Sequence, residues 1–128
     1  MIAVVDTSVL VHSWREGGSD LDALTGAVIP LAVHAELLVG VQMARDGDAE
    51  RRRLSRTYQL LQADVRRPTR ETAQAWSALS LQLRRIGRKV PHNDVWVAAA
   101  AVELHLPLLT RDKHHAGLPG VTLVALSE

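Results

Sequence analysis

Short stretches that suit a strand alternate with longer helical patterns along the whole chain, and this alternation is the feature that most restricts the fold. The predicted strands are residues 2–5, 27–29, 64–66, 108–110 and 121–124. Parallel neighbours in a sheet need a crossover connection, which a helix supplies. Parallel strands are also covered on both faces. The pattern therefore predicts an α/β fold with a short, mostly parallel five-stranded sheet between helices.

Helix signals fill the intervals between these strands. In residues 69–86 the side chains of Trp76, Leu79 and Leu83 recur at steps of three and four, which gives one apolar stripe. Residues 95–102 are apolar at every position, so this helix should be buried nearly all round. The other predicted helical segments are one that starts at Asp6-Thr7-Ser8, then 20–25, 31–45, 48–62 and a short helical or looped stretch at 111–118.

Length and composition favour one small globular unit. A chain of 128 residues with 47% apolar residues has room for one core, so we expect a single domain over residues 1–128. No stretch approaches the roughly 18 apolar residues that a membrane span needs, and residues 1–6 include no basic leader. We therefore expect a cytoplasmic protein without a membrane partner. The absence of Cys excludes a disulfide framework and thiolate zinc sites.

Net charge does not by itself indicate a nucleic-acid partner, because it is only +1. The distribution of charge is more informative, since 13 of the 15 basic residues are Arg, whose planar guanidinium suits contacts to phosphate. Each Arg cluster also suits the solvated face of a helix, so both interpretations stay open. The clusters are Arg51, Arg52, Arg53 and Arg56; Arg66, Arg67 and Arg70; and Arg84, Arg85, Arg88 and Lys89.

Four carboxylates are expected to meet at one edge of the sheet. Asp6 ends the first strand, and Asp112 follows the fourth by two residues. Asp94 begins the helix that leads into the fourth strand, and Glu36 lies one and a half turns into the helix after the second. The carboxyl ends of parallel strands share one edge, where the loops build a ligand site. The topology therefore makes convergence of these acids plausible.

Each acid taken alone also has a structural interpretation. Asp6 suits a helix cap, Asp94 a first-turn acid and Asp112 a turn. Glu36 is harder to explain in this way, because only it and His34 are polar within residues 31–41 and burial of an unpaired carboxylate is costly. Four acids in one pocket would repel one another without a hard cation, which predicts a site for Mg²⁺ or Mn²⁺.

Such a site suits hydrolysis of a phosphodiester, because a divalent cation activates water and offsets charge on the phosphate. Thr7, Ser8 and Thr110 would place hydroxyls beside the acids, although Thr7 also suits a simple cap. His92 and His114 each lie within two residues of a proposed ligand and are candidates for phosphate contact. Phosphate-binding glycine motifs are absent, which disfavours a nucleotide-binding enzyme. A nuclease and a non-catalytic metal- or RNA-binding module both remain open.

Three stretches, VVDTSVLV, AELLVG and GRKVPHNDVWVAAAAVELHLPLLTRDKHHAGLPGV, resemble the PIN-domain family, in particular VapC-type toxins of bacterial toxin-antitoxin pairs. The resemblance spans essentially the whole chain. It implies an α/β/α sandwich, a magnesium-dependent endoribonuclease acting on RNA, a homodimer and a cognate antitoxin that covers the acidic groove. It also implies metal binding by Asp6, Glu36, Asp94 and Asp112, with supporting hydroxyls from Ser8 and Thr110.

Two positions depart from the pattern of the family. His115 stands where Phe is common, and Trp96 replaces a small aliphatic side chain. His115 affects the packing of the loop after Asp112, and Trp96 affects the packing of the helix after Asp94.

Overall fold

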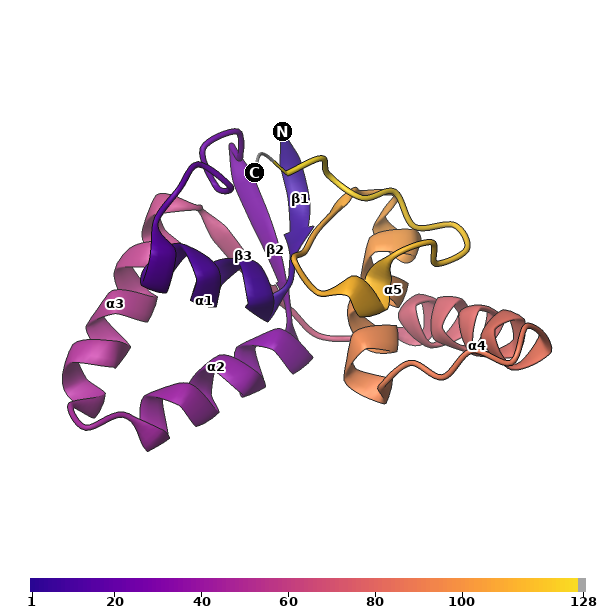
Figure 1. Cartoon of the computed structure of the whole chain (residues 1–128), viewed down its shortest axis with the longest axis horizontal. Helices are drawn as coiled ribbons and strands as arrows, with labels where there is room; N and C mark the ends of the chain where they lie inside the picture. Colours follow the sequence, from indigo (N-terminus) through magenta and orange to yellow (C-terminus); the bar gives the residue numbers. More distant parts are fainter. Residues whose placement is uncertain (127–128) are drawn as a thin grey trace.

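A parallel sheet lies at the centre of the protein, with helices on both sides (Figure 1). The structure is a computed structural model and describes residues 1–126. The strands are β1 (Ile2–Val5), β2 (Gly26–Pro30), β3 (Ala63–Arg66) and β4 (Leu108–Leu109), in the order β3-β2-β1-β4. Each neighbouring pair is parallel. The predicted α/β class and parallel pairing are confirmed.

The helices form the two outer layers of the predicted sandwich. They are α1 (Thr7–Glu16), α2 (Leu31–Met43), α3 (Gly47–Leu60), α4 (Arg70–Arg85) and α5 (His92–Leu104), with a short 3-10 helix η1 (Lys113–His115). In Figure 1, α1 and α3 lie on one side of the strands, while α4 and α5 lie on the other. None of the helices within residues 1–126 has the length and apolar character needed to cross a membrane.

The sheet has four strands rather than the predicted five. Residues 121–124 form a single parallel bridge, between Leu123 and Leu108, instead of a strand. The Leu108 amide donates to the Thr122 carbonyl at 2.8 Å, and the Val124 amide donates to the Leu108 carbonyl at 2.9 Å. Because β4 has only two residues, it offers this segment too short an edge for a longer ladder. Residues 20–23, predicted to begin a short helix, form turns.

The core lies on both sides of the central strands. Ala3, Val4 and Val5 are fully buried in β1, as are Leu108 and Leu109 in β4. Helix α5 presents Val95 and residues 97–101 to the interior, and its run of small Ala side chains allows close approach to its neighbours. The burial expected for this apolar helix is largely confirmed.

Helix α2 is apolar around its circumference but is not buried all round. Its inward face consists of Val33, Leu37 and Val41. The opposite face remains exposed and carries Leu31, Leu38, Val39 and Met43. Glu36 is also on an exposed part of α2, so the expectation that it is a buried carboxylate is wrong. The reason is that an apolar helix at the surface of a small protein can bury only one of its faces.

Candidate active site

Asp6 lies at the carboxyl end of β1 and is only 3% exposed. Its amide donates to the Leu109 carbonyl at 3.0 Å, which holds the end of β1 against the end of β4. The hydroxyls of Ser8 and Thr110 donate to Asp6 Oδ2 at 2.9 and 2.8 Å. The Asp6 carboxylate makes no capping hydrogen bond to α1, so the interpretation as a simple helix cap is not supported.

The two hydroxyls also hold the loop that follows β4. The Arg111 amide donates to Ser8 Oγ at 2.9 Å, and the Asp112 amide donates to Thr110 Oγ1 at 3.0 Å. The Arg111 guanidinium donates to both carboxylate oxygens of Asp20, at 2.6 and 3.0 Å. These hydrogen bonds lower the pKa of Asp20. The loop that carries Asp112 is thus fixed both to α1 and to the turn beyond it.

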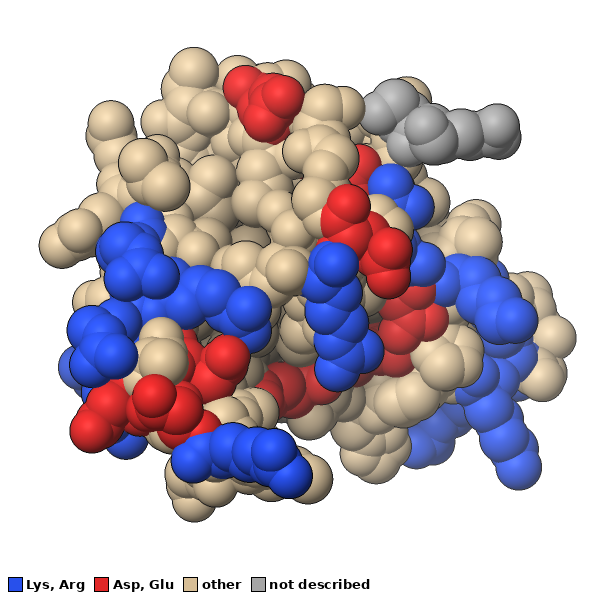
Figure 2. All heavy atoms as spheres, turned by 60° about the vertical axis from the view of Figure 1, so that its left-hand side comes forward, with Lys and Arg blue, Asp and Glu red and all other residues tan. Residues whose placement is uncertain are grey.

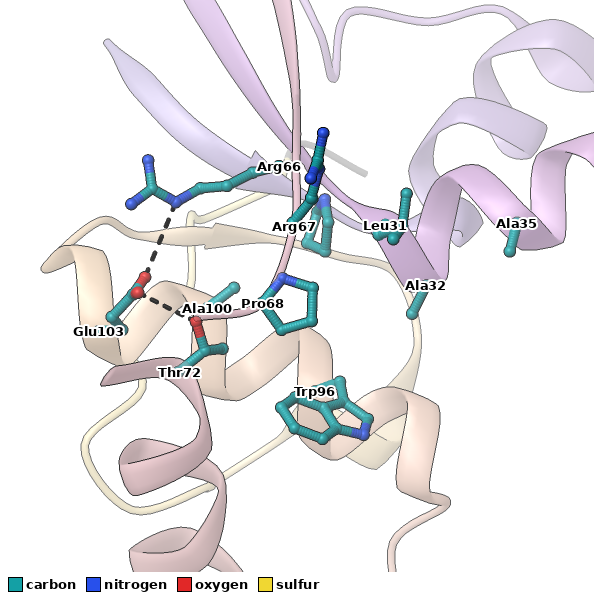
Figure 3. Close-up of a pocket in the computed structure, with 11 residues that line it drawn as sticks. Leu31, Ala32, Ala35, Arg66, Arg67, Pro68, Thr72, Trp96, Ala100 and Glu103 are labelled. Carbon is teal, nitrogen blue, oxygen red and sulfur yellow. Dashed lines mark hydrogen bonds and ion pairs between the residues drawn. The ribbon is translucent and has the colours of Figure 1, made fainter. Parts of the chain in front are cut away.

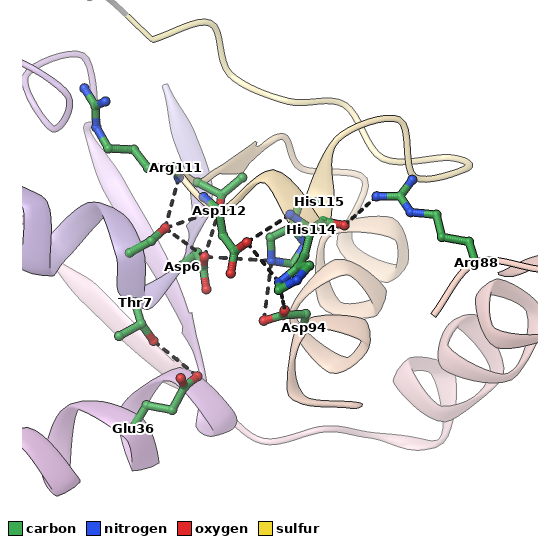
Figure 4. Close-up of polar contacts among 11 residues, drawn as sticks. Asp6, Thr7, Glu36, Arg88, Asp94, Arg111, Asp112, His114 and His115 are labelled. Carbon is green, nitrogen blue, oxygen red and sulfur yellow. Dashed lines mark hydrogen bonds and ion pairs between the residues drawn. The ribbon is translucent and has the colours of Figure 1, made fainter. Parts of the chain in front are cut away.

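Asp94 and Asp112 face each other across the ring of His114 (Figure 4). His114 Nδ1 lies 3.2 Å from Asp94 Oδ2 and 3.1 Å from Asp112 Oδ1. Burial raises the pKa of Asp94, and the charges of Asp112 and Asp6 raise it further against the opposing effect of the His115 and His114 rings. Partial burial alone would raise the pKa of Asp112, but hydrogen bonding from the His114 amide at 2.9 Å and the charge of its ring hold it below the ordinary value.

Glu36 approaches the same site from α2, at its rim (Figure 4). The Thr7 hydroxyl donates to Glu36 Oε1 at 3.3 Å, a role that a simple cap interpretation of Thr7 misses. Partial burial raises the pKa of Glu36, and the nearby charge of Asp6 raises it further. Three of the four predicted acids therefore meet closely, while the fourth lies within electrostatic reach of them.

His115 is a member of this cluster that the sequence analysis noted only as a departure from the family pattern. Its side chain is fully buried, and Nε2 lies 3.8 Å from both Asp6 Oδ2 and Asp94 Oδ1. Those distances exceed hydrogen-bond length. Within residues 1–126, neither ring nitrogen has a hydrogen-bond partner, an arrangement that costs about 1–3 kcal/mol for a buried polar group. No periodic pattern in the sequence indicates this position, because it depends on the three-residue 3-10 turn Lys113–His115.

These side chains form two groups whose geometry suits a metal ion. One consists of Asp6, Asp94 and His115, and the other of Asp94, Asp112 and His114. The potential ligand atoms in each group lie within 4.8 Å of one another. Carboxylate oxygens with imidazole nitrogens are suitable donors for a divalent cation. The buried, unpartnered nitrogen of His115 strengthens the fit, since a cation would give it a partner.

A basic cleft of about 680 Å³ borders the acids between α4 and the start of α5. The Arg88 guanidinium donates to the His114 carbonyl at 2.8 Å, which ties the cleft to the loop of the acidic cluster. Trp76 packs against Trp96 and His92, with ring centroids 5.5 and 5.8 Å apart. Figure 2 shows acidic side chains in a band across one face of the molecule, with Lys and Arg side chains on both sides of the band. The charged and His side chains that line the cleft are Arg84, Arg88, Lys89, His92 and His114.

The α/β fold and the carboxylates gathered at the ends of its parallel strands are the features that the resemblance to PIN domains implies. The chain belongs to the PIN-domain family, whose model matches residues 3–120. It is 33% identical over 129 residues to Ribonuclease VapC5 of Mycobacterium tuberculosis (strain ATCC 25618 / H37Rv), covering 96% of this chain and 92% of the relative. It is 35% identical over 127 residues to Ribonuclease VapC4 of the same organism, covering 97% and 96%.

Solved structures share the fold. VapBC2 from Rickettsia felis, bound to a DNA fragment from its promoter, superposes with a TM-score of 0.86 at 19% identity, covering 97% of this chain and 98% of that one. A toxin-antitoxin complex from Klebsiella pneumoniae gives a TM-score of 0.72 at 25% identity, covering 94% and 95%. The predicted PIN-domain family is confirmed by the family model and by the two relatives.

Proposed function

We propose that this chain is an endoribonuclease toxin that requires Mg²⁺ or Mn²⁺ and is inhibited by a cognate antitoxin. The observation that carries the proposal is the convergence of Asp6, Asp94 and Asp112 at one edge of the sheet, beside a basic cleft. RNA as the substrate is supported by the two relatives named as ribonucleases, which align with nearly the whole chain.

The proposed roles follow from the contacts of each residue. A bound divalent cation supplies activation of water and neutralises charge that develops on the phosphodiester. Asp6, Asp94 and Asp112 would hold the cation, while Ser8 and Thr110 keep the Asp6 carboxylate in one orientation through their hydrogen bonds. Glu36, on the open side of the site with Thr7 as its donor, would orient the attacking water.

The exposed His114 ring is positioned to contact a phosphate oxygen. It bridges Asp94 and Asp112 at the border of the basic cleft, where it is half exposed. An RNA strand that passes along the cleft would therefore meet this ring before the acids. This placement supports a phosphate contact by His114, and His92 lines the same cleft.

Removal of divalent cations tests the activity directly. Purified protein freed of any partner should cut RNA with Mg²⁺ or Mn²⁺, lose detectable cleavage with excess chelator, and recover it when the cation is restored. The measurement is the rate of cleavage of a labelled RNA. If the protein binds RNA and the cation but never cleaves, the alternative of a non-catalytic metal- or RNA-binding PIN module replaces the proposal.

The basic cleft is proposed to guide the RNA backbone. Exchange of Arg84 and Lys89 for Gln should weaken RNA binding about tenfold and reduce the slope of log affinity against log salt by about 1.4, because two phosphate contacts are lost. The matched control exchanges the exposed Arg52 and Arg56 of α3, on the opposite side of the sheet, for Gln. Equal effects from both pairs, measured by fluorescence anisotropy, would contradict a specific path along the cleft.

A groove between α1, α2 and α3 is the proposed docking site of the antitoxin. It has an apolar floor, with Val11, Trp14 and Leu37, and it reaches Glu36 and Thr7 at the rim of the acidic cluster. A segment laid in this groove would cover the approach to the acids. Co-expression of the antitoxin should consequently relieve any growth arrest caused by the free toxin.

The exposed face of α2 is proposed as the surface of a homodimer. It adjoins an apolar pocket of about 250 Å³, in which Trp96 faces Ala32 and Ala35 of α2 (Figure 3). Val39 is 53% exposed on this face. Light scattering should show a dimer for the native protein and a monomer for Val39→Asp, because a desolvated charge disfavours association. Leu60→Asp, at an exposed apolar residue of α3, is the control and should remain dimeric.

A further inference from the structure

We infer that Nε2 of His115 is a direct ligand of the divalent cation, together with carboxylate oxygens of Asp6 and Asp94. This inference rests on the metal dependence proposed above and extends it. The site would then be a mixed nitrogen and oxygen site instead of an all-oxygen one. Its consequence is a preference for first-row transition ions, with Mn²⁺ as the test case, over Mg²⁺.

The distances around His115 suit a shared ion. Two ligands held at about 2.1 Å from one ion lie within about 4.2 Å of each other, the separation that they have on opposite sides of the ion. His115 Nε2 lies 3.8 Å from Asp6 Oδ2 and 3.8 Å from Asp94 Oδ1. Both separations fall inside that range and outside the range of a hydrogen bond. An ion between the three atoms would give Nε2 of His115 a partner and would contact a carboxylate oxygen of each acid.

The environment of His115 indicates that its ring nitrogen has a function beyond filling space in the core. The ring is fully buried, and within residues 1–126 Nε2 has no hydrogen-bond partner. Polar atoms buried in a native protein are seldom left without one. A Phe would fill a similar space without any nitrogen to satisfy. The side chain is held in place by the η1 turn, in which the His115 amide donates to the Asp112 carbonyl at 3.2 Å.

His114 provides an internal comparison. It belongs to the second group, with Asp94 and Asp112, but its side chain is half exposed and its Nδ1 lies within 3.2 Å of both carboxylates. Its nitrogen therefore already has partners in the protein. The buried ring of His115 has no hydrogen-bond partner within the part of the chain described. The two adjacent histidines can therefore be tested separately.

The consequence for metal choice follows from donor chemistry. Mg²⁺ favours oxygen ligands in a strict octahedron and retains several waters. Imidazole binds first-row transition ions more readily than it binds such a hard cation. Exchange of one oxygen or water for Nε2 of His115 should therefore raise affinity for Mn²⁺ with little gain for Mg²⁺.

Calorimetric titration in the absence of RNA tests the inference. Mn²⁺ and Mg²⁺ are titrated separately into the whole protein as the native form, as His115→Phe and as His115→Gln, with thermal melting to verify that each variant is folded. We expect His115→Phe to lower Mn²⁺ affinity about tenfold or more and Mg²⁺ affinity less than about threefold. The exposed His105, which belongs to neither candidate metal group, is exchanged for Asn as the control and should leave both affinities unchanged.

Pulsed electron paramagnetic resonance of bound Mn²⁺ gives a second readout. The native protein should show the coupling of an imidazole nitrogen, which His115→Phe and His115→Gln lose and His114→Gln retains. Coupling that survives in both His115 variants, or Mn²⁺ affinity that is unchanged in them, overturns the inference. Metal binding that is intact but independent of His115 leaves the nuclease proposal standing. Failure of the native protein to bind either cation overturns both.

Discussion

Replacement of Asp6 by Asn should lower RNA cleavage by about 10²- to 10³-fold, a loss in the range seen when one group that stabilises a transition state is removed. Asp6 is nearly fully buried, and both Ser8 and Thr110 donate to its Oδ2. The amide of Asn removes the negative charge that would hold a cation. It also presents either a donor or a weaker acceptor to these two hydroxyls. The measurement is the single-turnover rate with saturating Mg²⁺ or Mn²⁺.

The matched control for Asp6 is Asp64→Asn, an exposed Asp of β3, which should cleave at the native rate. The same pair of variants tests the role as a toxin. Expression of the native chain or of Asp64→Asn should arrest growth of a host, while Asp6→Asn should not. Cleavage by Asp6→Asn at the native rate would point to a contaminating nuclease or to a different site. Harmless expression of an active native enzyme would remove support for the toxin role alone.

The parts of the site that the sequence predicts are those that depend on strand ends. A parallel sheet brings the residues after its strands to one edge, so the meeting of Asp6 and Asp112 follows from the order of the elements. Asp94 follows as well, because it lies in the first turn of α5, the helix that leads into β4. Ser8 and Thr110 are close enough in sequence to these acids to share their position, and both donate to Asp6.

The parts that the sequence does not predict depend on the rotation of a helix or on a short turn. Helix α2 has apolar residues on every side, so periodicity does not reveal that Val33 and Leu37 face inward while Val39 faces outward. For that reason the exposure of Glu36 cannot be predicted from the sequence. The position of His115 depends on a three-residue 3-10 turn, which carries no hydrophobic period at all. The missing fifth strand likewise reflects the short length of β4.

Asp94→Asn is expected to stabilise the metal-free protein, with a rise in Tm of about 3–6 °C for about 1 kcal/mol. Asp94 is partly buried, with Asp6 and Asp112 nearby. Both desolvation and repulsion by these acids therefore disfavour its charged form. The raised pKa of Asp94 means that the folded state binds its proton more tightly than the unfolded state does. The stability due to that proton is fully present below the ordinary carboxyl pKa and is lost as the pH rises through the folded value. The advantage of Asn should therefore be full at neutral pH and vanish under acid conditions.

Addition of a divalent cation should reverse the order of the two proteins. An ion that binds only the folded state stabilises it by about 2.7 kcal/mol at a concentration of 100 times Kd, so the Tm of the native protein should rise well above its metal-free value. Asp94→Asn loses the carboxylate shared by both candidate metal groups and should show little rise. Thermal melts with chelator and with Mn²⁺ measure both effects on the same samples.

A variant that melts lower than the native protein with chelator present would show that the contact of Asp94 with His114 stabilises the protein more than the repulsion by Asp6 and Asp112 destabilises it. A variant that gains as much from Mn²⁺ as the native protein would remove Asp94 from the set of ligands. The reversal is a sharp criterion because a carboxylate with only a structural role would change the Tm in the same direction under both conditions.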